Sequence, residues 1–231
     1  MKLAIVIPIV LAGFNLQAST IIASFNGELT SETIQRDVGD GAGFVDTTTG
    51  MFNFTRTGCT QVGVPNGTFF AFCIEPREFV SPGTNYTYDF NTLDQGATNI
   101  GGMGVAKADL IRELFGRNYP VIGAPINALN ASAMQIAIWE IVRENSSTLD
   151  VGTGNVRFRY PGDAGALTLA QTYLSALTGN GPKDNNLYAL TNFGAQDMLV
   201  QVPAPEPVML GTTGLGLIAL ALMLRRRYPA C

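Results

Sequence analysis

Residues Ser132–Glu144 read SAMQIAIWEIVRE and carry the strongest helical pattern in the chain. Ser132 is a favoured N-cap residue, and Gln135 follows it at the three-residue spacing of a capping box. A helix is therefore predicted to begin at Ser132 and to end at Glu144. Apolar residues at helical spacing predict two further helices, over residues 104–115 and 164–177.

Runs rich in Phe, Thr and Tyr precede this helical block and are typical of strands. They are TIIASF (20–25), GMFNFTRT (50–57), GTFFAFCIE (67–75) and TNYTYDF (84–90). Residues 186–202 predict one or two closing strands, and GDGAGF (39–44) predicts a turn. The body is therefore predicted to be α+β, that is, β-rich with about three helices.

The N-terminal residues 1–18 have the pattern of a secretory signal peptide. Lys2 precedes an apolar run that ends near Phe14, and the small residues Ala18 and Ser19 flank an expected cleavage point. The run is too short for a membrane-spanning helix. We therefore expect an exported protein with a body over residues 19–202.

Composition excludes several classes of function. The chain has no histidine, which removes Ser–His–Asp and Cys–His catalysis and the commonest zinc ligand. Residues 19–202 hold all but four of the 14 Lys and Arg and all but one of the 18 Asp and Glu, so the net charge of the body is −7. Nucleic acid is a poor partner for such a body. No cofactor or metal site is expected.

The C-terminal residues 203–231 combine three features in a fixed order. Pro205, Glu206 and Pro207 precede an uncharged stretch over residues 208–224, which is followed by Arg225, Arg226 and Arg227. The stretch predicts a short transmembrane helix with its arginine end in the cytoplasm and the body outside.

This order resembles the PEP-CTERM sorting signal. The resemblance implies recognition and cleavage by an exosortase in a Gram-negative host that produces exopolysaccharide. The chain is then expected to lie transiently in the inner membrane and afterwards at the cell surface or in the extracellular matrix. A plain tail anchor would have the same topology without the processing.

The body contains two cysteines, Cys59 and Cys73. An oxidising location favours a disulfide between them. Cys73 also lies in the apolar run FFAFCI, which is compatible with an inert buried residue. Both interpretations stay open at this point.

Two further motifs occur together, FCIEP at residues 72–76 and QIAIWE at residues 135–140. Together they resemble the thioester domain of bacterial surface adhesins. The resemblance implies an internal thioester between the Cys73 sulfur and the side-chain carbonyl of Gln135. Because an amide is a poor electrophile, we expect hydrogen-bond donors near the helix N-terminus to polarise that carbonyl. Trp139 and Glu75 are expected to support the site, with Trp139 shielding it. Gln135 has an alternative role as the N3 residue of the capping box.

The resulting hypothesis is a surface or matrix protein, and no enzyme, that attaches covalently to an amine or hydroxyl on a partner. A non-covalent component of the exopolysaccharide matrix, without a thioester, is the main alternative. A weaker alternative is a hydrolase that uses paired carboxylates among Glu75, Glu78, Glu140 and Glu144.

Overall fold

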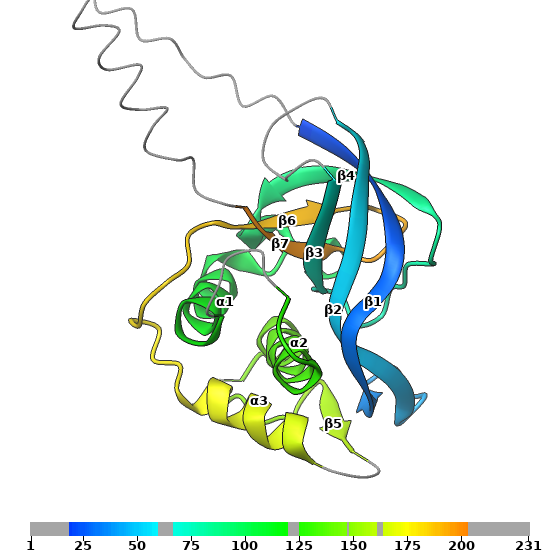
Figure 1. Ribbon diagram of the computed structural model, residues 1–231. Coiled ribbons are helices and arrows are strands. Elements are labelled where there is room, and N and C mark those ends of the chain that lie inside the picture. Colours follow the sequence, from blue (N-terminus) through cyan, green and yellow to red (C-terminus); the bar gives the residue numbers. More distant parts are fainter. Residues whose placement is uncertain (1–18, 60–66, 120–124, 147, 161–163, 203–231) are drawn as a thin grey trace, which may run out of the picture.

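A computed structural model describes residues 19–59, 67–119, 125–146, 148–160 and 164–202. Most of the strands gather on one side of the molecule and the helices on the other (Figure 1). The strands are β1 (Ser19–Asp37), β2 (Val45–Cys59), β3 (Gly67–Cys73), β4 (Asn85–Thr92), β5 (Arg157–Arg159), β6 (Leu187–Thr191) and β7 (Met198–Gln201). The helices are α1 (Gly104–Asn118), α2 (Ala128–Arg143) and α3 (Gly165–Ser175), with 3₁₀ turns η1 (Leu93–Gln95) and η2 (Thr98–Ile100).

Six of the strands close into an antiparallel barrel in the order β1-β2-β3-β7-β6-β4, with β4 pairing back onto β1. The β1–β2 hairpin is longer than the barrel. Along β1, residues 19–24 pair with β4, whereas residues 35–37 at the far end of β1 pair with β5. The far half of the hairpin therefore extends beyond the barrel, where α2 packs against β1 and β2.

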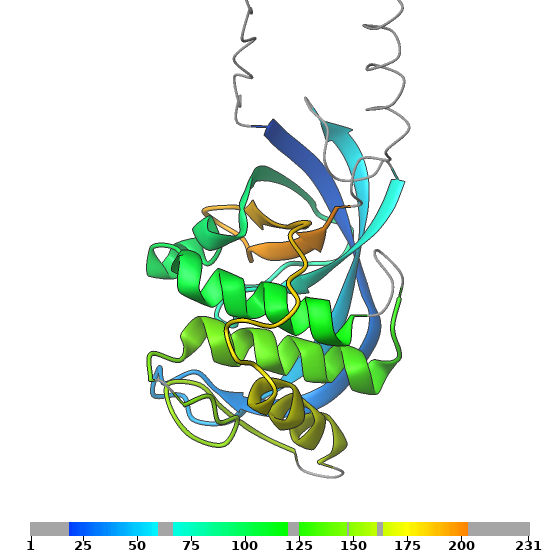
Figure 2. The ribbon, with the colours of Figure 1, turned by 90° about the vertical axis from the view of Figure 1, so that its left-hand side faces the viewer.

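Helix α2 lies at the centre of the molecule. Every residue from Ala131 to Val142 is buried, as expected for a helix covered on all sides. It packs against α3, α1 and strands β1, β2 and β3. The view in Figure 2 shows the three helices stacked beside one another along the barrel.

The start of α2 differs from the prediction. The helix begins at Ala128, and the N-cap is Asn127, whose side-chain oxygen accepts a 2.9 Å hydrogen bond from the Asn130 N–H. Asn is as good an N-cap as Ser, so the helix gains an extra turn before Ser132. The predicted capping box of Ser132 and Gln135 is wrong, because both side chains are buried within the helix.

The other elements follow the sequence pattern closely. The α+β class and the predicted strands are confirmed, and residues 186–202 form β6 and β7. Residues 39–44 connect β1 to β2. Strand β5 was not predicted, because three residues are too few to show an alternation. The predicted signal peptide, the sorting motif and the 208–224 helix lie outside the described residues. Within the described ranges, no helix is both long and apolar enough to cross a bilayer.

The barrel is filled by aromatic side chains. Phe54 is fully buried, and its ring lies 5.2 Å from that of Phe25 and 5.5 Å from that of Phe69. Phe72 packs edge-to-face against Phe115 of α1, which ties the barrel to the helices. Burial of these aromatic rings fixes the end of β3, where the candidate site lies.

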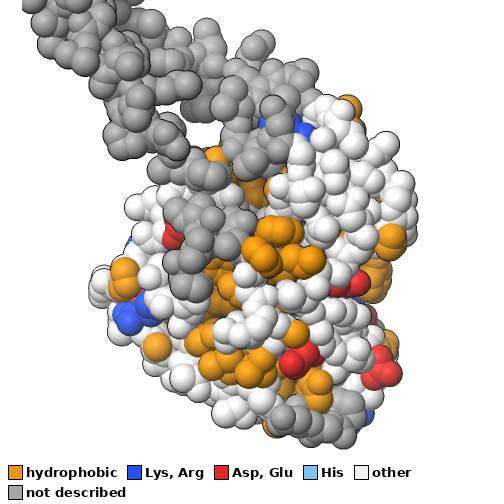
Figure 3. All heavy atoms as spheres, viewed as in Figure 1, with side chains coloured by type: hydrophobic (Ala, Val, Ile, Leu, Met, Phe, Trp, Pro, Cys, Tyr) orange, Lys and Arg blue, Asp and Glu red, His pale blue; other side chains and the backbone are white. Residues whose placement is uncertain are grey.

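The face of the molecule shown in Figure 3 carries mostly uncharged polar and hydrophobic side chains, with few charged ones.

Candidate functional site

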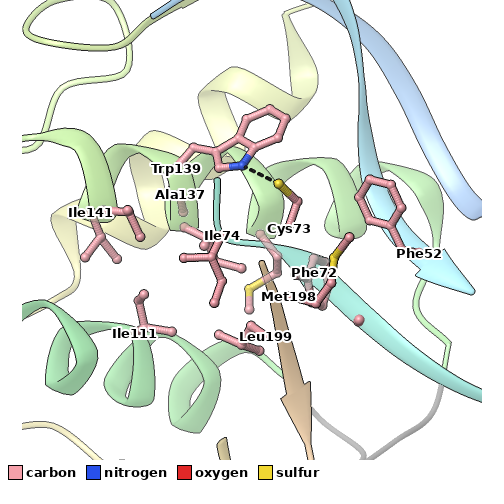
Figure 4. Packing of buried hydrophobic residues seen from close by; sticks show 14 of the residues in the cluster. Phe52, Phe72, Cys73, Ile74, Ile111, Ala137, Trp139, Ile141, Met198 and Leu199 are labelled. Atoms are coloured by element: carbon pink, nitrogen blue, oxygen red, sulfur yellow. Dashed lines mark hydrogen bonds between the residues drawn. The ribbon is translucent and has the colours of Figure 1, made fainter. Parts of the chain in front are cut away.

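Cys73 is the last residue of β3 and is fully buried. The run FFAFC places it between the barrel and α2. Its thiol lies 3.1 Å from the carbonyl oxygen of Glu75, to which it can donate, and its sulfur accepts a 3.2 Å hydrogen bond from Trp139 Nε1. Figure 4 shows the Trp139 indole directed at this sulfur among buried apolar side chains.

The Gln135 side chain is held at both ends by the backbone of Cys73. Its Oε1 accepts from the Cys73 N–H at 2.8 Å, and its Nε2 donates to the Cys73 carbonyl at 2.7 Å. Gln135 is fully buried and lies about two turns into α2. The donor that polarises its carbonyl is therefore the Cys73 amide, and not the helix N-terminus that was expected.

A gap in the sheet explains why Gln135 fits there. The Ile74 N–H bonds to the carbonyl of Asp197, just before β7, so the backbone groups of Cys73 point to the opposite edge of β3. The β2–β3 ladder ends at the pair Phe52–Ala71, which leaves no strand partner on that edge. The Gln135 amide supplies the missing donor and acceptor.

Ser132 makes the matching contact to the other strand. Its Oγ donates to the carbonyl of Thr49 in β2 at 2.6 Å. Ser132 and Gln135 lie three residues apart on one helix face. The two side chains thus join α2 to β2 and β3 at the point where these strands separate.

Trp139 links the sulfur to a buried cation. Its ring is stacked on Phe158 at 6.2 Å, and the Arg36 guanidinium lies 5.3 Å from its centroid. Arg36 is only 5% exposed, and its Nε and Nη1 have no hydrogen-bond partner among the described residues. Ile34 and Arg36 in β1 and Val38 just after it are all buried, and this alternation is the sequence signal that could have placed Arg36 on the inner face.

Glu75 and two residues from the β6–β7 segment complete the site. The Glu75 carbonyl also accepts from Gln196 Nε2 at 3.1 Å. Its carboxylate accepts from the backbone N–H groups of Asn99 and Asp197 at 2.7 and 3.1 Å. Sequence reasoning missed Gln196 and Asp197, because only the β3–β7 pairing brings them beside Cys73.

Burial controls the ionisation of the site. Burial raises the pKa of the Cys73 thiol far above its usual value, while the Trp139 N–H and the charge of Arg36 act in the opposite direction. Burial, and then the neighbouring Glu78 carboxyl, raises the pKa of Glu75 to about 7. Before any reaction the sulfur is therefore a thiol, next to two groups that favour a thiolate when one forms.

The predicted alternative of a Cys59–Cys73 disulfide is wrong, because Cys73 is a free thiol. Continued past its last pair, Phe52–Ala71, the β2–β3 register would bring Cys73 level with Gly50, nine residues along β2 from Cys59. Nine residues at about 3.3 Å each separate the two positions. A disulfide needs Cα atoms within about 7 Å.

The carboxylates considered for a hydrolase mostly accept hydrogen bonds from backbone groups, although the Glu75 and Glu78 side chains are neighbours. Glu144 accepts from the N–H groups of Asn145, Ser146 and Asn155, and Glu140 accepts from that of Asp150. Glu75 likewise holds backbone N–H groups. These side chains position loops around α2. Within the described residues, no group of Cys, Asp and Glu side chains is arranged to bind a metal ion.

A cavity of about 290 Å³ adjoins the site. Its inner wall contains Arg36, Trp139 and Gln196, two of which touch Cys73 or its hydrogen-bond acceptor. Exposed residues, among them Glu28 and Phe79, line its mouth. The cavity therefore leads from the surface to the side chains that surround the sulfur.

Comparisons of the chain with protein-family models, with curated proteins and with solved structures found no match. The likeness to thioester domains and to the PEP-CTERM signal therefore stays a prediction from the motifs. The geometry above stands on the described residues alone.

Proposed function

We propose that the chain is an exported surface or matrix protein that attaches covalently to a partner through a Cys73–Gln135 thioester. One observation carries this proposal. The Gln135 amide is held by two hydrogen bonds, of 2.8 and 2.7 Å, on the backbone of the residue that bears the only described free thiol. Such fixed placement lowers the entropic barrier to reaction between the two side chains.

Formation of the thioester balances without a further reactant. The Cys73 sulfur bonds to the Gln135 side-chain carbon, the carbon–nitrogen bond breaks, and the thiol proton leaves with the amide nitrogen as ammonia. The Cys73 N–H, already on Oε1, stabilises the negative charge that develops on that oxygen.

Attachment then consumes the thioester once. An amine or hydroxyl of the partner attacks the carbonyl carbon, the carbon–sulfur bond breaks, and the proton of the nucleophile passes to the Cys73 sulfur. The Trp139 N–H and the positive charge of Arg36 stabilise the departing thiolate. The adjoining cavity gives the nucleophile its route.

We further propose that the segment with Pro205, Glu206 and Pro207 delivers this domain outside the inner membrane through exosortase processing. The motif, the apolar stretch and the arginine cluster in the sequence support this part. A stored thioester is useful only where a partner is encountered, and export supplies that setting.

Intact mass of the purified chain tests the covalent function, with the chain ends established from terminal peptides. The expected mass is one ammonia below that of the sequence, and methylamine treatment should restore it as an adduct. Cys73→Ala should show the full sequence mass and no adduct. A wild-type mass without the ammonia deficit would contradict the proposal.

A second candidate is a non-covalent matrix protein of the same fold. It is favoured by the structural role of Gln135, whose amide closes the β2–β3 gap without any reaction. A folded protein with full mass and a free Cys73 thiol would support this alternative.

A further inference from the structure

A second cavity, of about 640 Å³, collects a large share of the positive charge of the body. Four basic side chains line it, namely those of Arg77, Lys107, Arg143 and Arg157. The same body holds only ten Lys and Arg against seventeen Asp and Glu. No carboxylate side chain lines the cavity among the described residues.

Three of the four cations have no carboxylate partner. Within the described ranges, Arg157 forms an ion pair with Asp37. Arg77, Lys107 and Arg143 form no ion pair there. Lys107 donates instead to the Val142 carbonyl at 2.7 Å and to Asn145 Oδ1 at 3.2 Å. These three positive charges gather without direct neutralisation, which favours an anion between them.

These groups line one cavity and repel one another. Burial, and then the charge of Arg143, lowers the pKa of Lys107, and burial, and then the charge of Arg77, lowers the pKa of Arg143. Glu144 and Glu75 are the acidic groups that act on them in the opposite sense. The Nε of Arg143 is buried and has no hydrogen-bond partner in the described chain.

The remaining lining selects the class of anion. It includes the side-chain amides of Asn145 and Asn155, which can bond hydroxyl groups, and none of the described residues that line it is aromatic. Nucleic-acid sites usually offer aromatic rings for stacking. Carboxylates for the arginines and hydroxyls for the amides are both present in acidic sugars.

We propose that this cavity binds an acidic glycan that carries uronic acid residues. Arg143 lies one helical turn beyond Trp139, and Arg77 lies four residues beyond Cys73, so the cavity and the thioester site are built on the same two segments. The idea that the glycan is the covalent partner rests on the proposed function, whereas binding of the glycan in the cavity does not require a thioester.

Calorimetric titration with an oligomer of galacturonic acid tests the proposal, with a neutral oligosaccharide of equal length as control. The acidic oligomer should bind and weaken as salt is raised, and the neutral one should not bind. Lys107→Gln and Arg77→Gln should each weaken binding about five-fold or more. Lys183→Gln should leave it unchanged, because Lys183 is paired with Asp109 away from the cavity.

Equal binding of the neutral oligosaccharide, or no binding of the acidic one by wild type, would overturn the inference without reliance on any variant. An oligoglutamate that binds as tightly as the uronic acid oligomer would overturn the glycan assignment. Repetition in Cys73→Ser separates the two proposals. If Cys73→Ser, which has no ammonia deficit, still binds the acidic oligomer, the glycan site is supported independently of the thioester. A wild type with the deficit and no binding retains only the thioester.

Discussion

Among the buried polar side chains of helix α2, Gln135 and Glu140 lie in contrasting environments. Both are fully buried. The Gln135 amide has partners on both its polar atoms, whereas Glu140 accepts one N–H, from Asp150, and its Oε2 has no partner among the described residues. Burial raises the pKa of Glu140 to about 8. The Gln135 amide thus completes the hydrogen bonding of the fold, whereas the Glu140 carboxyl is accommodated in the folded state chiefly when it is protonated.

The largest expected effect follows removal of the Gln135 amide. In a Cys73→Ser background, where no thioester forms, Gln135→Ala leaves the Cys73-position N–H and carbonyl buried without partners. Two such groups cost about 2–5 kcal/mol of unfolding free energy. Denaturant unfolding measures the loss, and a change below about 1 kcal/mol would show that the sheet gap closes in another way.

Glu140→Gln is expected to increase the free energy of unfolding at alkaline pH, whereas Gln135→Ala decreases it. The folded pKa of about 8 lies above the ordinary value of 4.5, so the folded state binds more protons between these values. The contribution of Glu140 to stability is therefore present below about pH 4.5 and is lost as pH rises to about 8. The variant should be more stable than wild type at pH 9, by on the order of 2 kcal/mol, and should show no such gain at pH 4.

Glu144, the C-cap residue of the same helix, provides the matched control. Although burial raises its pKa, the N–H groups of Ser146, Asn155 and Asn145 lower it overall. The stability that it contributes is present above its ordinary pKa and is lost as pH falls. Glu144→Gln should therefore destabilise the protein at neutral pH, and a gain in stability there would contradict the comparison.

Trp139→Phe should have a smaller effect on stability and a clear effect on reactivity. It removes the N–H donor to the Cys73 sulfur and retains an aromatic ring beside Phe158. We expect a loss of about 1 kcal/mol in unfolding free energy. The rate of methylamine capture should fall because the departing thiolate loses its donor. An unchanged rate would show that the Trp139 N–H does not assist the departure of the thiolate.

Ser132→Ala is expected to have the smallest effect, about 1 kcal/mol or less in thermal or denaturant unfolding. It removes the 2.6 Å bond to the Thr49 carbonyl, at the edge of the same gap. Asn127→Ala, which removes the true N-cap, should cost a similar amount and should leave methylamine capture unchanged. A loss of methylamine capture in Asn127→Ala would contradict this expectation.

The sequence predicted most of the fold, because strand alternation and helical spacing are local properties. It placed the start of α2 wrongly, because Ser132 and Gln135 have the spacing of a capping box and yet serve the gap between β2 and β3. Their partners, Thr49 and Cys73, are far away in sequence. Local patterns do not report which strand edges remain unpaired.

The candidate site was predicted only in part for the same reason. The pairing of the Cys73 and Gln135 segments came from motif resemblance, and the disulfide with Cys59 was an inference from export that ignored strand register. Arg36 and Gln196 reach the site through the β1–β2 hairpin and the β3–β7 pairing. Only the assembled barrel brings these residues together.

Peptide mapping of the pepsin-digested chain at acid pH tests the central claim most directly. The thioester account predicts one species in which the Cys73 peptide is joined to the Gln135 peptide, with a mass one ammonia below the sum of the two. Methylamine should separate it into a peptide with a free Cys73 thiol and a peptide with a methylated Gln135 amide. Separate peptides with a free thiol and an intact amide before any treatment would contradict the account.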